Sequence, residues 1–65
     1  MIVRVNRTSI EFPDNTTVRT AVMTYAARRS VSKTRVRRMQ VYDLDGRELD
    51  LDETLSDGDA IKCVM

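Results

Sequence analysis

The pair Asp45-Gly46 constrains the fold of this chain more than any other feature, because it is a strong signal for a β-hairpin. Asp and Gly both accept the positive φ angles of a type I′ turn, and apolar residues occur on either side of the pair. We therefore expect a strand over residues 38–44, a two-residue turn, and a short partner strand that includes Leu49 and Leu51.

The register of this hairpin follows from the length of its turn. A two-residue turn places Tyr42 opposite Leu49 and Gln40 opposite Leu51, on the more apolar face, which we expect to meet a helix. Val41 then lies on the other face of the strand, together with Asp43, and this face is expected to be exposed.

A second hairpin is predicted at the start of the chain. Apolar and other residues alternate over residues 1–6 and again over 10–12, which is the period of a half-buried strand. Residues 6–9 are polar and turn-like, so we expect a loop of about three to five residues between the two strands.

One helix is predicted over residues 16–29, with Asn15 or Thr16 as its N-cap. Its apolar residues recur at helical spacing, and Arg28 and Arg29 suit the negative end of the helix dipole. We interpret residues 30–37 as a loop or an irregular extension of the helix. The apolar set of the helix is Val18, Ala21, Val22, Tyr25 and Ala26.

The last elements are a loop and a strand. Leu55 is the one apolar residue of the loop 53–57 and is expected to fill the core, while the final strand covers residues 60–65 with Ile61 and Cys63 facing inward. The order of elements predicts an α+β domain with two layers: a mixed sheet of four or five strands and one helix across it. The first and last strands should lie side by side and parallel at the centre of the sheet.

The length of 65 residues predicts a single domain, residues 1–65, with a small core. So small a chain has little room for a deep cleft, and we expect no small-molecule substrate. No apolar run approaches the roughly 20 residues that span a bilayer, and no signal peptide is evident, so we expect no membrane partner. A single cysteine is compatible with a reducing compartment, and we expect a soluble, cytoplasmic protein.

Three segments together resemble the ubiquitin-like β-grasp superfamily. Residues 1–5, with Met1, Val3 and Val5 facing inward, resemble the first strand of ubiquitin. Residues 44–50 resemble its later hairpin, and residues 53–57 its threonine-leucine-serine-aspartate loop. Residues 57–59, Asp-Gly-Asp, are more similar to the sulfur-carrier branch. The resemblance spans nearly the whole chain and implies the β-grasp fold and a function in binding other proteins.

The sequence also departs from this superfamily in ways that bear on function. Ubiquitin and the sulfur carriers end in a flexible tail with a terminal Gly-Gly, whereas residues 62–65 read Lys-Cys-Val-Met. Conjugation or sulfur transfer by that route is therefore not supported. Asp43 stands where ubiquitin has an exposed apolar recognition residue, and Arg47 stands where it has a chain-linking lysine, so neither of those roles is implied.

Catalysis, cofactors and metal ions are not expected. The chain has no histidine, which removes the usual general base and the commonest metal ligand. The carboxylates of residues 43–52 are predicted to form a solvated acidic face, and their spacing around Gly46 does not match an EF-hand loop. Cys63 is third from the end, so it does not match a prenylation signal, and we expect it to be a small buried hydrophobe.

Charge is strongly segregated along the chain. Residues 28–38 contain six of the eleven bases and no acid, and residues 43–59 contain eight of the ten acids. We call residues 28–38 the basic segment, and its cations are the predicted partner-binding residues. These are Arg28, Arg29, Lys33, Arg35, Arg37 and Arg38.

The sequence leaves three functions open. The first is a non-enzymatic, ubiquitin-like adaptor or subunit that binds a protein with an acidic surface through the basic segment. The second is a sulfur carrier or protein modifier whose Gly-Gly tail is absent from this sequence. The third is a nucleic-acid-binding module, although the basic segment has no aromatic residue for base stacking and the pI of about 7.9 is below that of dedicated binders.

Overall fold

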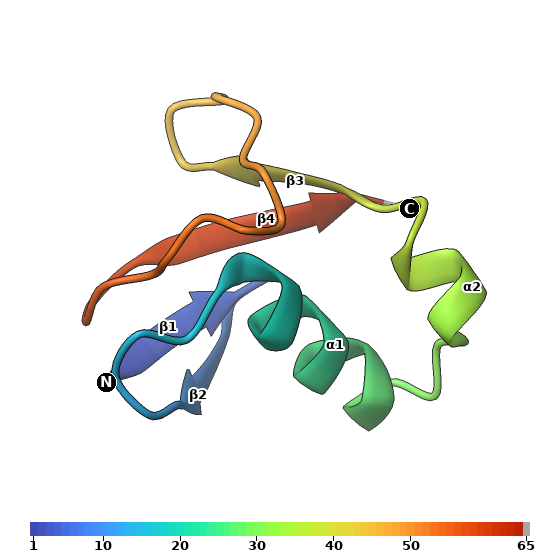
Figure 1. The fold of residues 1–65 in the computed structure, drawn as a ribbon, viewed down its shortest axis with the longest axis horizontal. Helices are drawn as coiled ribbons and strands as arrows, with labels where there is room; N and C mark the ends of the chain where they lie inside the picture. Colours follow the sequence, from blue (N-terminus) through green and yellow to red (C-terminus); the bar gives the residue numbers. More distant parts are fainter. Residues whose placement is uncertain (65) are drawn as a thin grey trace.

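The structure, a computed structural model, describes residues 1–64 and contains four strands and two helices (Figure 1). The sheet has the order β2-β1-β4-β3, in which β1 and β4 are parallel and the two outer pairs are antiparallel. The predicted α+β class and the central parallel pair are therefore confirmed. The elements are β1 (Ile2–Val5), β2 (Thr8–Glu11), α1 (Val18–Arg28), α2 (Lys33–Val36), β3 (Gln40–Asp43) and β4 (Ala60–Val64).

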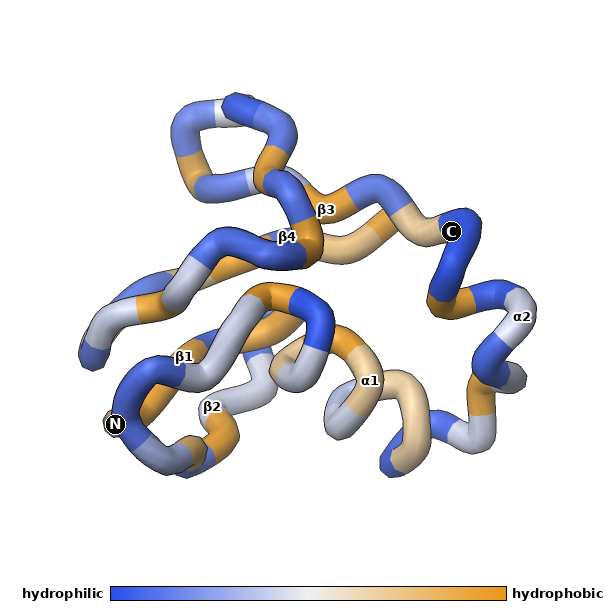
Figure 2. The backbone as a smooth tube through the Cα atoms, in the orientation of Figure 1, coloured by the Kyte–Doolittle hydropathy of each residue, from blue (hydrophilic) through white to orange (hydrophobic). Residues whose placement is uncertain are grey.

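The core lies between α1 and one face of the sheet, where the apolar residues gather (Figures 1 and 2). The inward positions of β1 and β4 are as predicted, and Leu55 fills the core from its loop with 6% exposure. The predicted end of the last strand at residue 65 lies outside the described residues. The buried apolar residues are Val3, Val5, Ile10, Phe12, Val18, Ala21, Val22, Ala26, Val36, Met39, Val41, Leu55, Ile61 and Cys63.

The first hairpin has a tighter turn than predicted. Asn6 and Arg7 have φ angles of 47° and 72°, so they form a two-residue turn of the type I′ kind, and β2 begins at Thr8. The side chain of Asn6 also takes the place of a peptide group beside β4. Its Nδ2 donates to the carbonyl of Cys63 at 3.2 Å, and its Oδ1 accepts from the Cys63 N–H at 3.0 Å. Asn6 thereby extends the parallel pairing of β1 and β4 past the end of β1.

The helix α1 agrees with the prediction, but its N-cap does not. Thr17, rather than Asn15 or Thr16, is the cap, and its Oγ1 accepts a bond from the Thr20 N–H at 3.4 Å. Thr16 instead donates its hydroxyl to the Pro13 carbonyl at 2.7 Å, while Asn15 has a φ of 67°. The sequence offered several adjacent capping residues, and the turn after Pro13 decided which of them caps the helix.

The helix α1 ends in a Schellman motif. Ser30 has a φ of 57°, and the N–H of Val31 donates to the carbonyl of Ala26 at 2.9 Å. Residues 33–36 then form the separate helix α2, so the predicted loop or irregular extension was wrong. Ser32 caps this short helix by accepting a bond from the Arg35 N–H at 3.3 Å.

The Asp45-Gly46 hairpin differs from its predicted register by one residue. The Gly46 N–H donates to the Asp43 carbonyl at 3.2 Å, Gly46 has a φ of 85°, and Tyr42 pairs with Glu48. The loop therefore has three residues, a type I turn followed by a left-handed glycine, instead of the two of a type I′ turn. Within residues 1–64 the expected fifth strand is reduced to this single bridge.

The faces of β3 are also opposite to those predicted. Val41 pairs with Cys63 and is buried, whereas Gln40 is exposed and Tyr42 is half-buried on the outer face. Pairing with β4 determines which side chains of β3 face the core, and the local apolar pattern did not reveal this pairing.

In the part of the chain that the structure describes, no helix is long and apolar enough to cross a bilayer.

Candidate interaction surface

The basic segment lies at the α2 end of the molecule. Arg28 is the last residue of α1, and Arg29 is its C-cap; Lys33 and Arg35 belong to α2, which ends at its C-cap Arg37. All six predicted cations, including Arg38, are exposed. The structure thus brings together on one end of the molecule the residues that the sequence singled out.

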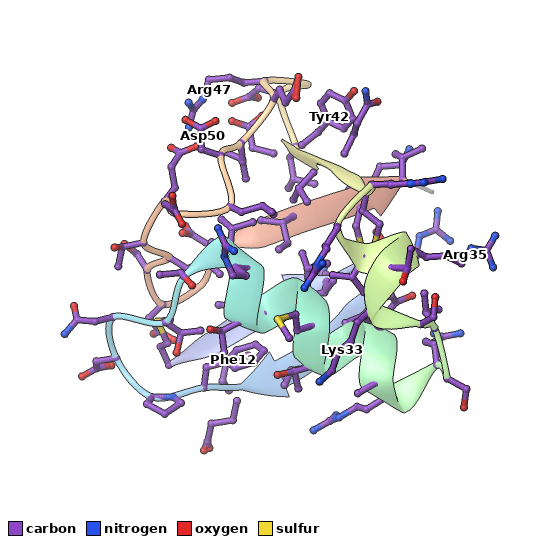
Figure 3. All side chains as sticks on the ribbon, turned by 45° about the vertical axis from the view of Figure 1, so that its right-hand side comes forward. Phe12, Lys33, Arg35, Tyr42, Arg47 and Asp50 are labelled. Carbon is purple, nitrogen blue, oxygen red and sulfur yellow. The ribbon has the colours of Figure 1, made fainter. Side chains whose placement is uncertain are left out.

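Helical geometry divides these cations between two sides of α2. Lys33, Val36 and Arg37 are three and four residues apart, so they share the side that faces α1. Figure 3 shows Lys33 on this side and Arg35 pointing away from it. An extended segment would place Arg35 and Arg37 on one side, whereas the helical conformation of α2 places them on different sides.

None of the ion pairs within residues 1–64 involves a cation of the basic segment. Arg29 lies over the ring of Tyr25, with its guanidinium carbon 5.2 Å from the ring centroid, and this contact occupies one ring face. Among the described residues, the cations of the segment therefore have no anionic side chain as a partner.

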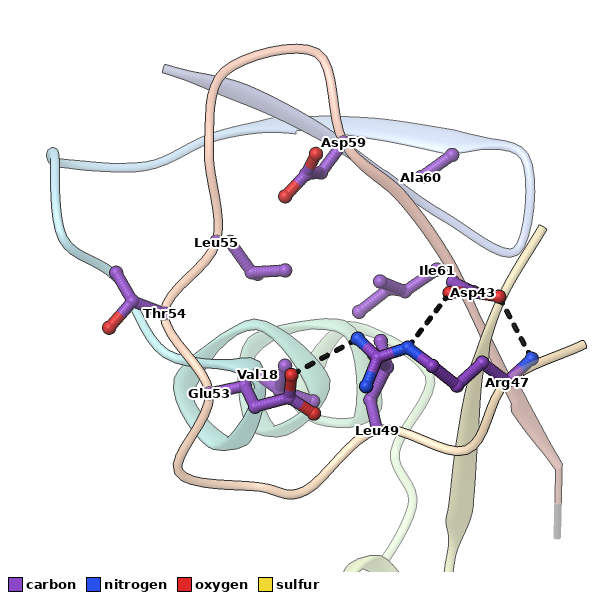
Figure 4. A pocket seen from close by; sticks show the side chains of 10 residues that line it. All are labelled: Val18, Asp43, Arg47, Leu49, Glu53, Thr54, Leu55, Asp59, Ala60 and Ile61. Carbon is purple, nitrogen blue, oxygen red and sulfur yellow. Dashed lines mark hydrogen bonds and ion pairs between the residues drawn. The ribbon is translucent and has the colours of Figure 1, made fainter. Parts of the chain in front are cut away.

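The acidic part of the chain contrasts with this arrangement, because several of its carboxylates are used inside the fold. Arg47 contacts Asp43 at 3.4 Å and Glu53 at 3.1 Å, so it links the β3 hairpin to the loop before β4 (Figure 4). The carbonyl of Glu53 also accepts the Val18 N–H at 2.9 Å, which satisfies one free donor at the start of α1. These contacts hold the β3 hairpin, the loop before β4 and the start of α1 together at the mouth of a small cavity.

Two carboxylates at this cavity, Asp43 and Glu53, have lowered pKa values, which favours their ionised forms. The backbone N–H of Arg47 donates to Asp43 and lowers the pKa of that carboxyl, assisted by the Asp45 N–H and the Arg47 guanidinium. The N–H of Asp50 and then Arg47 lower the pKa of Glu53 in the same way. A general acid at neutral pH needs the opposite shift, so at this cavity of about 180 Å³ these two carboxylates act as partners of Arg47 in an ion-pair network.

Two further features bear on chemistry. Within residues 1–64, no group of three or more Cys, Asp or Glu side chains is placed to hold a metal ion. Burial raises the pKa of the Cys63 thiol, which is 8% exposed, and thereby disfavours the nucleophilic thiolate.

The structure also reveals residues that the sequence analysis did not assign to any surface. Met23, Val36 and Leu51 line a hollow between α1 and α2, together with Arg19, Lys33 and Arg37. The one available signal was Val36, an apolar residue three positions after Lys33 inside a basic run.

Comparison of the chain with the models of known protein families and with curated proteins finds no match.

Proposed function

We propose that the chain is a ubiquitin-like β-grasp domain that acts as a non-enzymatic protein-interaction module. The fold proposal is supported by a mixed sheet with a central parallel pair, crossed on one face by α1. The order of hairpin, helix and returning strands is the arrangement that the superfamily resemblance implies.

A single observation carries the functional proposal: the six cations of the basic segment are exposed and form no ion pair within residues 1–64. Clustered like charges repel one another and contribute little to folding, so their concentration on one end is best explained by an external ligand of opposite charge. We propose that this ligand is an acidic surface of a partner protein.

The experiment that tests this function uses the purified protein as bait in an extract of its native host, followed by mass spectrometry. Each captured protein is then purified and titrated against the bait directly. The matched control bait is the triple variant Arg35→Glu, Arg37→Glu, Arg38→Glu. A partner with an acidic surface should bind the natural protein and bind the control at least about tenfold more weakly. Equal binding of both baits at low salt would overturn the proposal.

Nucleic acid is the competing ligand, and the same titration separates the two. Phosphate binding by a basic segment makes the logarithm of the affinity fall steeply and linearly with the logarithm of salt concentration, whatever the base sequence. If single-stranded oligonucleotides bind with such a slope and the captured proteins do not bind, the protein-partner proposal is wrong.

A further inference from the structure

A shallow groove of about 220 Å³ separates α1 from α2 and is lined by apolar and cationic residues. Half of its lining is apolar and half is cationic, and no carboxylate lines it. The groove is smaller than the roughly 300–1,000 Å³ of typical small-molecule sites, so its size suits one or two side chains of a partner. Its lining residues are Arg19, Met23, Lys33, Val36, Arg37 and Leu51.

Each wall of the groove follows from local structure. Arg19 and Met23 are four residues apart on α1 and share one face, and the spacing of Lys33, Val36 and Arg37 places these three on the facing side of α2. The third wall is Leu51, which is held in place because its carbonyl accepts the Arg19 N–H at 2.9 Å.

The apolar lining has a buried part and an accessible part. Val36 is 7% exposed and joins the core, and Leu51 packs against the core at intermediate exposure. Met23 remains 40% exposed, although it belongs to the helix that covers the sheet. A flexible thioether at such a position can adapt to a ligand side chain and is common on peptide-binding surfaces.

The cations of the groove differ in how far they are already engaged. Arg19 pairs with Asp52 at 2.9 Å at one end, and both side chains are largely exposed. Lys33 and Arg37 form no ion pair within residues 1–64. The groove therefore presents two available positive charges beside an accessible apolar surface.

We infer that this groove binds an acidic peptide segment of a partner protein, one that carries a Leu- or Met-sized side chain among its carboxylates. The apolar side chain contacts Met23, Val36 and Leu51, and the neighbouring carboxylates contact Lys33 and Arg37. This inference rests on the proposed function and specifies its site and ligand. A protein segment is favoured over a nucleic acid because the lining is aliphatic and includes no aromatic side chain on which a base could stack.

The test measures fluorescence anisotropy of a labelled peptide, Asp-Glu-Asp-Ile-Leu-Asp-Glu-Asp, on the full chain. Two double variants carry the same change of charge within the same segment. Lys33→Glu with Arg37→Glu alters the groove, whereas Arg35→Glu with Arg38→Glu alters cations that do not line it. Binding should weaken at least about tenfold in the first variant and less than about threefold in the second.

A second comparison tests the apolar contact. Met23→Ser should weaken peptide binding by about tenfold, whereas Ile2→Ser, at an apolar residue that is exposed outside the groove, should leave it unchanged. The peptide in which Ile-Leu is replaced by Ser-Ser should bind the natural protein as weakly as the original peptide binds Met23→Ser. Circular dichroism confirms that each variant is folded before it is titrated.

The outcomes separate the groove from the proposed function. If the peptide fails to bind, if both double variants lose affinity equally, or if the Ser-Ser peptide binds as tightly, the groove inference is wrong, while capture of acidic partners by the basic segment still stands. If neither double variant affects binding of a captured partner, the proposed function is wrong as well. An oligonucleotide that displaces the peptide and shows the same variant dependence would assign the groove to nucleic acid.

Discussion

At the scale of single residues, Asn6 combines two tasks that are usually performed by different groups. Its backbone adopts the left-handed conformation of the β1–β2 turn, and its amide side chain bonds both backbone groups of Cys63. Asparagine suits this position because it tolerates positive φ and its side chain resembles a peptide group.

Two substitutions separate these tasks. Asn6→Gly keeps the turn conformation and loses the amide bonds, so we expect it to lower the free energy of unfolding by about 1–3 kcal/mol. Unlike Asn6→Gly, Asn6→Ala keeps a β-carbon in the left-handed region, so it should lower the free energy of unfolding by about 1 kcal/mol more than Asn6→Gly does. Urea titration of the three proteins measures both differences. A fully stable Gly variant would show that the amide bonds contribute nothing.

Cys63 should react slowly while the protein is folded. Its inward position on β4 shields the sulfur, and burial holds the pKa of the thiol above its ordinary value of 9.0. We expect a thiol reagent at neutral pH to modify the native protein far more slowly than the urea-unfolded protein.

The matched control for Cys63 is its neighbour on the outer face. In a Cys63→Ala background, Lys62→Cys should react nearly as fast in the native protein as in the unfolded one, because residue 62 is exposed. Equal native rates for the two cysteines would mean that β4 is shifted by one residue, which exchanges its faces.

At the scale of elements, the end of α1 contains a residue that is poorly suited to its conformation. Ser30 occupies the left-handed position of the Schellman motif, where glycine has no steric cost. Ser30→Gly should therefore raise the free energy of unfolding by about 0.5–1 kcal/mol. Thermal unfolding measures the gain, and Ser30→Ala, which keeps the β-carbon, should show no gain. A loss of stability in Ser30→Gly would mean that the Ser30 side chain has a stabilising contact.

The hairpin after β3 should make the fold sensitive to acid. The folded pKa values of Asp43 and Glu53 lie below their ordinary values of 3.8 and 4.5, because backbone N–H groups and Arg47 favour the charged forms. The unfolded chain therefore takes up these protons first. The stability that the two carboxylates contribute is complete above their ordinary values and is lost as pH falls through the lower folded values.

Urea unfolding between about pH 6 and pH 3 tests this linkage. Asp43→Asn should lose less stability over this range than the natural protein, because one linked proton has been removed. Asp45→Asn changes an exposed carboxylate of the same loop that accepts no bond within residues 1–64, and it should follow the natural protein. Identical pH profiles for Asp43→Asn and the natural protein would contradict the assigned network.

At the scale of the whole molecule, a net charge of +1 conceals two opposed regions. Arg35 lies at the α2 end, and Arg47 and Asp50 lie at the hairpin end (Figure 3). Such a field mainly accelerates encounter with a complementary partner and selects its orientation, whereas each exposed ion pair adds only about 0.2–1 kcal/mol.

Association and dissociation rates of an acidic partner should reveal this electrostatic steering directly. Reversing Arg35, Arg37 and Arg38 to Glu should weaken binding of an acidic partner by about ten- to a hundredfold, chiefly through a slower association rate. The difference between the variant and the natural protein should shrink toward 1 M salt, where the screening length is about 3 Å. A change confined to the dissociation rate would show that these residues form close contacts and have no steering role.

The sequence by itself determined the features that depend on local pattern. The alternation of residues 1–6 and 60–64 identified the inward faces of β1 and β4, and the spacing of apolar residues identified α1 within two residues at each end. The exposure of the cations of the basic segment also followed from its composition, because clustered cations are costly to bury. These results rest on burial and desolvation, which act on each residue through its own chemistry and its near neighbours.

Only the tertiary structure decided the register of the Asp45-Gly46 hairpin, the faces of β3 and the fate of residues 30–37. Asp-Gly is compatible with both two- and three-residue loops, and pairing of Val41 with Cys63, which is distant in sequence, selected the inward face. Val36 reaches the core only because α2 folds back against α1, and this docking also creates the groove between the two helices. Contacts between distant segments made these choices, and the energy differences among the local alternatives are too small for the pattern of neighbouring residues to reveal them.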